Sequence, residues 1–386
     1  MKTRRVNDND ITIQRRDFIY GGLAGLAGLL FSDALFSASV FAGSSKLNVL
    51  GRWNTMTKDP KKIYDESIII DACAPLASVS DNYKRYLKGG VTVIAATVFP
   101  TGGYLSETIT GIAEYYARYR ADDSLKPILT VNDIYEAKRE QKLGIMLAFQ
   151  GTSHLQANIS LIEIYYNLGI RQMMLCYNTK NPVGDGCEER TNAGLSRFGE
   201  KAIKEMNRLG ILVDLSHTGY TTTMEAMEVS EKPVVFSHGN ARGVFNSMRN
   251  LTDEQVVKVA KMGGTVGVNG YPAFISSDRR PKVNAFIDHI DYYVNLVGID
   301  HVALGLDYYQ CQAGILDDAT SKKIYDDLIA TGQWSTKTYP PPPYHYPEEI
   351  KLPELLPNLA PALAARGYAE SDIKKILGEN YLRVLK

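Results

Sequence analysis

The sequence predicts an α/β fold, a TIM (β/α)8 barrel, and three observations lead to this fold class. Eight short β-branched or apolar runs alternate with amphipathic helical patterns along the chain. Most of the runs are too short and too apolar to be anything but buried parallel strands. The 386 residues are near the upper range for one such barrel. An open doubly wound sheet would give the same alternation, but no G-x-G-x-x-G follows an early strand, which favours the barrel.

The predicted strands and the helices between them follow from local signals in chain order. The strands cover residues 68–73, 91–98, 144–150, 171–177, 211–217, 233–238, 264–270 and 301–307. One helix is expected between Ser196 as its N-cap and Gly210 as its end. A second follows Thr252 and also ends at glycine, and VNAFIDHIDYYVNLVG has apolar residues at helical spacing.

The first 42 residues are predicted to be an export signal, and the barrel domain is predicted to span residues 43–386. Arg15-Arg16 precede an aromatic residue, as in a bacterial twin-arginine signal. The apolar stretch that follows is too short for a comfortable membrane span. The alternative is an ordinary secretory signal or uncleaved anchor with a chance arginine pair. We therefore expect an exported, periplasmic protein whose mature chain has no stable membrane span.

The composition argues against a polyanionic partner. Lys+Arg and Asp+Glu balance at 43 each, so nothing points to nucleic acid. Export would bring the four cysteines into a compartment that permits disulfides. Cys187 and Cys311 both lie in polar, loop-like stretches, so a bridge between them is the pairing that we expect.

Several predicted strands end on a side chain that can take part in chemistry, namely Cys73, Gln150, Tyr177, His217, His238 and Asp307. In a barrel these ends converge on one face, where catalysis is normally located. His217 and His238 close consecutive strands in matching Ser-His pairs, and neutral imidazole is a natural zinc ligand. The pair therefore predicts a metal site, with two hydrogen-bonded histidines and no metal as the alternative.

Asp307 and Arg249 are candidates for the same face. Asp307 closes the run ALGLD and is a candidate acid/base or metal ligand, with a cap for the following turn as the alternative. Arg249 ends the run SHGNARGVFNSMRN and could hold a substrate carboxylate by a bidentate contact. The alternative for Arg249 is a surface arginine.

Four segments carry a resemblance to a known family: YNTKNPVGDGCEERTNAGLSRFGEKAIKEMNRLGILVDLSHTG, SHGNARGVFNSMRNLTDE, HVALGLDYY and YAESDIKKILGENYLRVLK. Together they resemble the membrane (renal-type) dipeptidases, zinc metallopeptidases with a TIM barrel of the metal-dependent hydrolase type. The resemblance covers nearly all of the predicted mature chain. It implies a small peptide as substrate, and since dimers are common in that family it also implies a homodimer.

The resemblance implies a role for each candidate residue. In that family two zinc ions share a bridging glutamate and a bridging hydroxide, and two histidines that match His217 and His238 hold the second ion. An arginine that matches Arg249 meets the terminal carboxylate of the substrate. An aspartate that matches Asp307 assists proton transfer. Tyr177 stands at a substrate-contacting position that is histidine in some relatives, and it can still donate a hydrogen bond.

The stretch IIIDACAPLA, residues 68–77, departs from the pattern of the family. Family members usually carry Asp-Gly-His-x-Asp there, and its histidine and second aspartate bind the first zinc. Cys73 and Pro75 stand at these positions here, and Gln150 replaces the bridging glutamate. Pro75 offers no donor atom, and Gln150 lacks the negative charge that holds two divalent cations together. Only Cys73, if ionised, could restore one ligand and one charge.

Two functional hypotheses from different classes follow. In the first, one zinc ion on His217 and His238, completed by Gln150, Asp307, Cys73 or water, cuts a dipeptide or a similar small amide with a free carboxylate. In the second, the chain binds no metal, is catalytically inactive and holds a small peptide-like ligand in the barrel mouth. Retention of His217, His238, Arg249 and Asp307 favours the first hypothesis. Loss of the three first-site ligands favours the second.

The other histidines are expected to play smaller parts. His154 is the one nearby base that could activate Cys73 as a nucleophile, a third and less favoured hypothesis. His289 and His301 are expected to be structural. His345 lies in the proline-rich segment TYPPPPYHYPEE, which is expected to run as an extended loop over or beside the barrel mouth.

Overall fold

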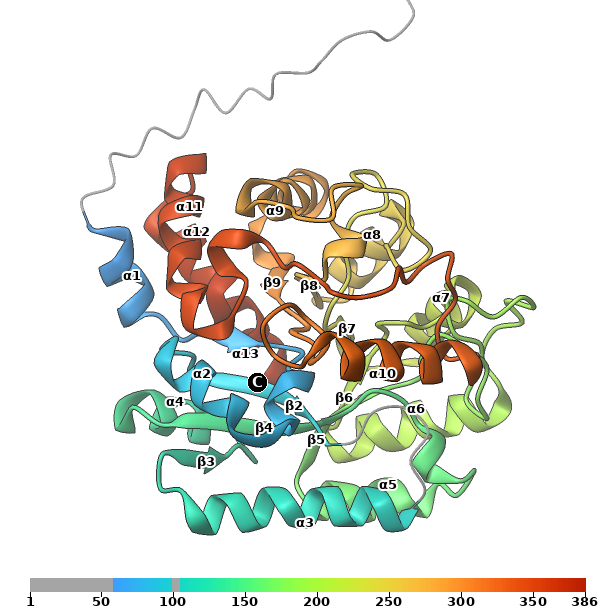
Figure 1. Ribbon diagram of the computed structural model, residues 1–386. Helices are drawn as coiled ribbons and strands as arrows, with labels where there is room; N and C mark the ends of the chain where they lie inside the picture. The colour runs from blue at the N-terminus through green and yellow to red at the C-terminus, as the bar shows by residue number, and fades with distance from the viewer. Residues whose placement is uncertain (1–57, 99–104) are drawn as a thin grey trace, which may run out of the picture. The chain divides into compact units, whose positions relative to one another are not determined.

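The computed structural model of the chain describes residues 58–98 and 105–386 (Figure 1). The predicted export signal and its boundary at residue 42 lie outside the described residues. Among the helices that the structure describes, none is both long enough and apolar enough to cross a membrane.

Within the described residues, nine parallel strands form one sheet that winds into a nearly closed barrel. Eight of them follow one another in the order β1-β2-β4-β5-β6-β7-β8-β9, and β3 pairs with β4 outside this path. The strands are β1 (Ile70–Asp71), β2 (Val93–Thr97), β3 (Leu125–Pro127), β4 (Leu143–Phe149), β5 (Ile170–Met174), β6 (Leu212–Asp214), β7 (Val235–Phe236), β8 (Thr265–Val268) and β9 (Val302–Leu304).

Backbone hydrogen bonds next to β1 and β9 bring the first and last strands of the barrel together. The Ala72 N–H donates to the Leu304 carbonyl at 2.9 Å, and the Asp307 N–H donates to the Cys73 carbonyl at 3.0 Å. Each of the eight predicted runs overlaps one strand of the barrel path, so the predicted TIM barrel is confirmed. The sequence did not predict β3, because its residues Leu-Lys-Pro lack a β-branched run.

Helices surround the barrel (Figure 1), and their ends follow the capping signals of the sequence. The helices are α1 (Pro60–Glu66), α2 (Tyr83–Lys88), α3 (Leu105–Ala121), α4 (Val131–Glu140), α5 (Ser160–Asn167), α6 (Arg197–Leu209), α7 (Tyr220–Val229), α8 (Asp253–Lys261), α9 (Val283–Val297), α10 (Asp318–Ala330), α11 (Leu359–Arg366), α12 (Glu370–Lys374) and α13 (Asn380–Leu385). The Ser196 hydroxyl accepts from the Gly199 N–H, and Gly210 ends α6 in the left-handed region at φ 80°. Thr252 and Gln255 form the capping box of α8. These predicted ends are confirmed.

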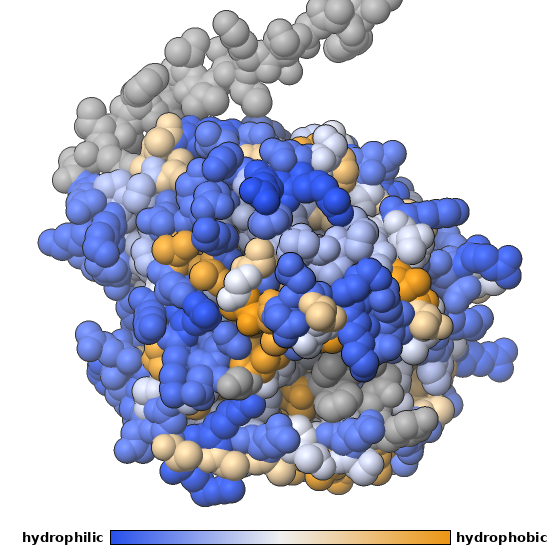
Figure 2. Space-filling view, in the orientation of Figure 1, coloured by the Kyte–Doolittle hydropathy of each residue, from blue (hydrophilic) through white to orange (hydrophobic). Residues whose placement is uncertain are grey.

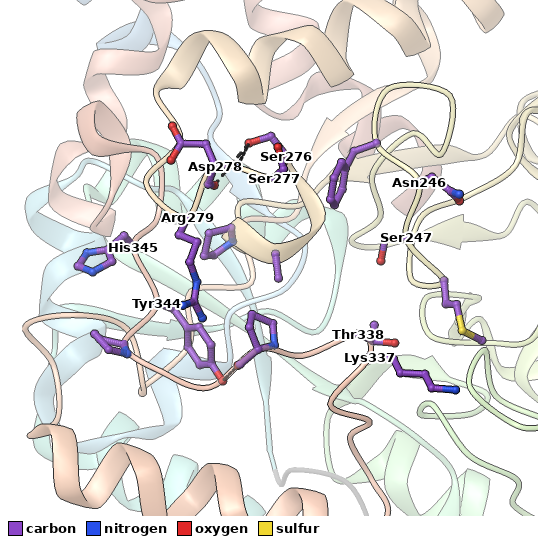
Figure 3. A pocket seen from close by; sticks show the side chains of 16 residues that line it. Asn246, Ser247, Ser276, Ser277, Asp278, Arg279, Lys337, Thr338, Tyr344 and His345 are labelled. Carbon is purple, nitrogen blue, oxygen red and sulfur yellow. Dashed lines mark hydrogen bonds between the residues drawn. The ribbon is translucent and has the colours of Figure 1, made fainter.

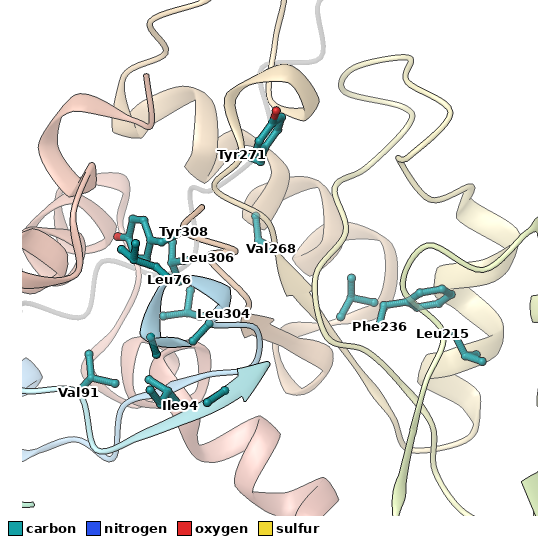
Figure 4. Packing of buried hydrophobic residues seen from close by; sticks show 14 of the residues in the cluster. Leu76, Val91, Ile94, Leu215, Phe236, Val268, Tyr271, Leu304, Leu306 and Tyr308 are labelled. Atoms are coloured by element: carbon teal, nitrogen blue, oxygen red, sulfur yellow. The ribbon is translucent and has the colours of Figure 1, made fainter. Parts of the chain in front are cut away.

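A continuous apolar core holds the strands against the helices (Figure 4). Its fully buried members come from successive strand ends, among them Phe236 in β7, Val268 in β8, Leu304 in β9 and Tyr308 beyond it. Burying one such side chain contributes roughly 1.5–3 kcal/mol. The packing therefore holds the strand ends rigidly, and these are the positions that carry the predicted site residues.

The face of the molecule seen in Figure 2 is mainly hydrophilic, with apolar side chains in small areas between polar ones. The large apolar side chains that are exposed come from several different elements: Ile109, Leu129, Tyr135, Ile164, Tyr220, Val244 and Met248. Isolated exposed apolar side chains of this kind are ordinary for a folded domain.

The predicted disulfide between Cys187 and Cys311 is wrong, because all four cysteines are free thiols. The Cys187 thiol faces the side-chain oxygen of Asn178 at 3.5 Å. Cys311 is buried beside Tyr309 and Ser321 instead. The two cysteines thus pack against different neighbours, a tertiary arrangement that loop-like sequence around each of them cannot reveal.

Candidate metal centre

Four of the predicted site residues bring ligand atoms together at the carboxyl ends of the strands. The Sγ atom of Cys73, a ring nitrogen of His238 and a carboxylate oxygen of Asp307 all lie within 4.8 Å of one another. The Nε2 atoms of His217 and His238 are 2.9 Å apart. The predicted convergence of these strand ends is therefore present in the structure.

Gln150 and Tyr177 adjoin this cluster. The Gln150 side chain donates through Nε2 to the Cys73 thiol and to the Thr97 hydroxyl, both at 3.1 Å. In this orientation Gln150 turns its amide N–H group, and not its carbonyl oxygen, toward the Cys73 thiol. An N–H group cannot bind a metal ion. The Tyr177 ring stacks on the His217 imidazole, with the ring centres 4.0 Å apart. Tyr177 therefore forms a wall of the site directly beside a candidate ligand.

Asn178 sets the tautomer of His217. Its side-chain amide nitrogen donates to the Gln333 carbonyl at 2.9 Å and faces the Tyr339 hydroxyl at 3.1 Å, which directs its oxygen toward the imidazole. The His217 Nδ1–H donates to that oxygen at 2.7 Å. A neutral imidazole carries only one N–H, so the Nε2 atom of His217 bears a lone pair.

A second relay sets the tautomer of His238. The Ser237 hydroxyl donates to the Asp214 carboxylate at 2.5 Å and therefore accepts from the His238 Nδ1–H at 2.8 Å. Asp214 also accepts from the backbone and hydroxyl of Ser216, from the Ser237 N–H and from Gln172. Asp214 is the acceptor in each of these contacts, so the Ser237 hydroxyl hydrogen points to it and the His238 Nε2 atom also bears a lone pair.

These two lone pairs face each other inside the protein and repel one another. A cation bound by both nitrogen atoms would remove this repulsion. Burial lowers the pKa of both His217 and His238 well below the ordinary value, and the charge of Arg249 lowers it further. Protonation of either histidine, which would place an N–H between the two lone pairs, is therefore unfavourable. Two imidazole nitrogens with a thiol and a carboxylate beside them are a donor set that suits zinc.

The backbone at two of the candidate ligands is strained. His217 has φ 60° and Asp307 has φ 53°, both in the left-handed region that favours glycine. Such residues cost on the order of 1–3 kcal/mol each and gather at functional sites. The surrounding packing holds both side chains at the barrel mouth at this cost, which is consistent with a binding role for each.

Burial also governs the acidic side of the centre. It raises the pKa of Asp307 to about 6, against the opposing charge of Arg249. It raises the pKa of the Cys73 thiol well above the ordinary value, and the negative charges of Asp307 and Asp71 add to this. Without a cation Cys73 is therefore a neutral thiol, 3.5 Å from an Asp307 oxygen. A bound cation would have to displace that proton to make Cys73 a ligand.

Arg249 is not the surface arginine that its spacing also allowed. Its side chain is 3% exposed, and its guanidinium lies over the Phe274 ring, 5.3 Å from the ring centre. Among the described residues, its Nε and Nη2 atoms have no hydrogen-bond partner. Buried donors on a cation are costly unless they are paired, so this guanidinium is poised for an anionic group that enters the site.

Two cavities lie near this end of the barrel. The smaller, about 180 Å³, has Gln150, Tyr177, His217 and Asp307 in its wall, together with Pro75. The larger, about 520 Å³, holds none of the predicted site residues and is lined by residues such as Met248, Arg279, Lys337 and His345 (Figure 3). The smaller cavity is therefore the candidate site, in spite of its size.

The proline-rich segment borders both cavities, as the sequence predicted for the barrel mouth. Tyr339 faces the smaller cavity, whereas Pro340, Pro343 and Tyr344 face the larger one. Tyr346 donates from its hydroxyl to the backbone carbonyl of Asp307. The segment thus anchors directly to a residue of the candidate centre.

The remaining histidines are structural. The His289 ring accepts from the Ala241 N–H at 3.1 Å and donates to the Ile275 carbonyl at 2.9 Å. His301 bonds to the Gly264 carbonyl at 2.8 Å. His154 packs against the Phe149 ring at 3.8 Å, and burial lowers the pKa of His154 to about 3.

The arrangement offers no support for Cys73 as a nucleophile that His154 activates. Among the described residues, the side-chain hydrogen bonds of Cys73 go to Asp307 and Gln150. A base needs to lie within hydrogen-bond reach of the proton that it takes. Burial also disfavours the thiolate.

Comparison with protein families shows which family this chain belongs to. The family model described as membrane dipeptidase (peptidase family M19) matches residues 60–338. The chain belongs to the membrane dipeptidase family. An amidohydrolase from Pseudomonas aeruginosa has a similar structure, with a TM-score of 0.76 and 31% identity, over 85% of this chain and 98% of that one.

Curated relatives that are named as dipeptidases match a smaller part of this chain. An uncharacterized dipeptidase of Schizosaccharomyces pombe is 33% identical over 63% of this chain and 53% of its own length. Dipeptidase 3 of Mus musculus is 28% identical over 64% of this chain and 45% of its own. The chain thus spans about half the length of these curated relatives.

A metallopeptidase from Rhodobacter sphaeroides, solved with a phosphinate mimic of the dipeptide L-Ala-D-Ala, shares the fold. Its TM-score is 0.67 at 19% identity, over 83% of this chain and 99% of that one. At this level of identity the likeness concerns the fold alone.

Sequence reasoning missed the residues that orient the ligands of this membrane dipeptidase family member. Asn178, Asp214 and Ser237 hold the two imidazoles, and the Trp334 indole donates to the Tyr177 hydroxyl at 2.8 Å. The serine before each histidine, in LVDLSH and VVFSH, was the one sign in the sequence of the residues that hold the imidazoles. The contacts of Asn178 and Trp334 depend on the path of distant loops.

Proposed function

We propose that this chain is a dipeptidase-like metallohydrolase that binds one zinc ion and cleaves a dipeptide or a similar small amide with a free carboxylate. The observation that carries the proposal is the convergence of two oriented imidazole lone pairs, 2.9 Å apart, beside the buried Arg249 with its unpaired donors. The first group fits a metal and the second fits a carboxylate.

His217 and His238 would hold the zinc ion, with Cys73 and Asp307 in reach to complete the site. When bound, zinc supplies Lewis acidity, which activates water and polarises the amide carbonyl. The relays through Asn178 and through Ser237 keep both Nε2 atoms free for the metal.

Arg249 and Asp307 would act on the substrate. The Arg249 guanidinium binds the free carboxylate and so fixes the amide relative to the metal end of the cavity. Asp307 has a pKa raised to about 6 by burial, which suits a group that takes and returns a proton near neutral pH. The Asn269 side chain donates to its Oδ2 at 3.3 Å and orients it.

The same geometry argues for one ion rather than two. Pro75 supplies no ligand atom, and Gln150 faces the Cys73 thiol with a neutral amide. The Oδ1 atom of Asp71 accepts from the N–H groups of Cys73 and Leu306, and burial raises the pKa of Asp71 to about 7. The acidic side of the centre is thus short of the charge that a second divalent cation requires.

The alternative is a catalytically inactive protein that binds a small peptide-like ligand in the same cavity. The three altered first-zinc positions and the raised pKa of Cys73 favour it. It would use Arg249 as the anchor of the ligand and would need no metal.

Metal content per chain separates these functions. We expect elemental analysis of protein purified without chelators to find about one zinc per chain, which His238→Ala removes and the matched variant His289→Ala retains. We also expect a dipeptide screen to find activity that His238→Ala abolishes. Two zinc ions per chain would contradict the one-ion site. A folded chain without zinc would leave the inactive alternative.

We also propose that residues 1–42 direct the protein out of the cell by the twin-arginine route. The arginine pair ahead of an aromatic residue and a short apolar stretch supports this. Replacing Arg15 and Arg16 together by lysine should keep the protein in the cytoplasm, as fractionation would show. Unchanged export would count against this route. The homodimer stays a prediction, which light scattering would test.

A further inference from the structure

We infer that the cavity contains a side-chain subsite built by α10 and the segment after it, which selects substrates with a large, uncharged, aromatic or aliphatic side chain. The inference rests on the proposed function, since it concerns the same cavity. It assigns specificity to Ile324, Leu328 and Trp334, which lie away from the metal ligands.

The first support is the apolar face that α10 turns toward the cavity. Ile324 and Leu328 stand one helical turn apart, are half-buried and line the cavity. The outer face of α10 carries exposed ion pairs, such as Lys323 with Asp327 at 3.6 Å. A helix with this pattern normally buries its apolar stripe against the core, whereas part of this stripe faces the open cavity.

The second support is a set of aromatic rings that continues this wall. The Trp334 and Tyr339 rings are stacked, with centres 4.2 Å apart and an angle of 8° between their planes. Tyr309 lies next to Trp334 at 5.5 Å, and both line the cavity. Aromatic walls favour apolar and aromatic groups through burial and ring packing.

Hydrogen bonds connect this wall to the metal end of the cavity. The Trp334 indole N–H donates to the Tyr177 hydroxyl at 2.8 Å, and the Tyr177 ring stacks on His217. The Tyr339 hydroxyl contacts Asn178, which orients the same histidine. The subsite is therefore preformed and fixed relative to the candidate ligands, as specificity between similar substrates requires.

The third support is the distribution of charge. Among the described residues that line the cavity, His217 and Asp307 are the two with a basic or acidic side chain, and both belong to the metal end. A lysine or glutamate side chain placed against α10 would lose its hydration without meeting an opposite charge. The subsite should therefore reject charged side chains.

The size of the cavity limits the length of the substrate. Its volume of about 180 Å³ lies below the range of roughly 300–1,000 Å³ typical of pockets for larger ligands. With the amide at the metal end and one side chain against α10, little room is left for further residues. The subsite thus fits a dipeptide with one large apolar side chain.

Dipeptides that differ only in one side chain test the subsite. We expect kcat/KM for the phenylalanine and leucine members to exceed that for the glutamate, lysine and alanine members at least about tenfold, a ratio within reach of apolar pockets. Equal values for charged and aromatic members would overturn the inference.

Variants of α10 locate the specificity. Leu328→Glu should lower kcat/KM for the phenylalanine substrate about tenfold or more, mainly through KM, and should leave the zinc content unchanged. Leu328→Ala removes bulk without adding charge, so it should reduce the preference for phenylalanine over alanine even if the glutamate variant folds poorly. Lys323→Glu on the outer face is the matched control. It should change neither kcat/KM for the phenylalanine substrate nor the preference for phenylalanine over alanine. An unchanged preference in Leu328→Ala would overturn the assignment.

Calorimetric binding separates this inference from the proposed function. If the wild-type chain hydrolyses none of the peptides, the proposed function fails. The same series is then titrated into the protein. Tighter binding of the aromatic than of the charged member, lost in Leu328→Ala, would support the subsite, and equal binding or no binding of all members would overturn it.

Discussion

At the scale of single residues, the side chains behind the ligands decide what the two histidines can do. The Asn178 oxygen accepts from His217, and the Ser237 hydroxyl accepts from His238 while it donates to Asp214. Each relay leaves the Nε2 atom as the free lone pair. Partners of this kind fix the tautomer and the ring orientation of metal-binding histidines.

Removing one relay should weaken metal binding without removing a ligand. Asn178→Ala leaves the His217 Nδ1–H without its acceptor, so we expect the zinc affinity to fall roughly 10–100-fold. Competition with a chromophoric chelator would measure this. Asn295→Ala is the control, because Asn295 lies on α9 and donates locally to the Asp291 carbonyl. Equal zinc affinity of the two variants would show that the relay is dispensable.

At the scale of elements, two glycines let the strands approach one another beneath His238. A Cβ atom at Gly267 would lie 1.9 Å from the Ser237 carbonyl oxygen, and one at Gly305 would lie 1.8 Å from the same atom. Backbone at this distance cannot give way as the end of a flexible side chain can. The position of β7, and with it that of His238, therefore depends on both glycines.

Gly305→Ala should accordingly disturb both stability and the metal centre. Forcing β7 aside is overpacking, which typically costs about 1–3 kcal/mol in the free energy of unfolding. We expect denaturant unfolding to show a loss of this size, together with weaker zinc binding. Gly332→Ala, in an open turn at φ 72° with nothing within 4 Å of the added Cβ atom, should cost about 1–2 kcal/mol and spare zinc binding. Intact zinc affinity in Gly305→Ala would contradict this account of β7.

At the scale of the whole molecule, buried neutral histidines make stability depend on pH. Burial lowers the pKa of His289 from 6.5 to about 4. Between these values the unfolded chain binds more protons than the folded chain, so this residue lowers stability as the pH falls from about 6.5 to 4. At about 1.4 kcal/mol per pKa unit, the loss amounts to about 3 kcal/mol.

His289→Gln should remove this dependence. We expect the wild-type chain to lose about 3 kcal/mol more of its unfolding free energy than the variant between pH 7 and pH 4. Urea unfolding at both pH values would measure the difference, in which the contributions of the other histidines cancel. Parallel loss in the two proteins would mean that His289 does not titrate in this range.

Much of the fold was readable from local pattern. The short apolar runs placed the eight strands of the barrel path, because a buried parallel strand must be apolar on both faces. Ser196, Gly210 and Thr252 marked helix ends correctly, because capping depends on side chains next to the end itself. β3 was missed, since its pairing with β4 rather than its own sequence makes it a strand.

The sequence by itself determined the barrel, the family, and which side chains would share the barrel mouth, because parallel strands send their carboxyl ends to one face. It also predicts that the DACAP stretch and Gln150 do not form the usual first zinc site. Only the tertiary structure decided that Arg249 is buried and unpaired, that Cys187 and Cys311 lie apart, and that Trp334 and α10 wall the cavity. These features depend on long loops that contact residues far away in the chain. No local pattern in the sequence determines the positions of such loops in the folded protein.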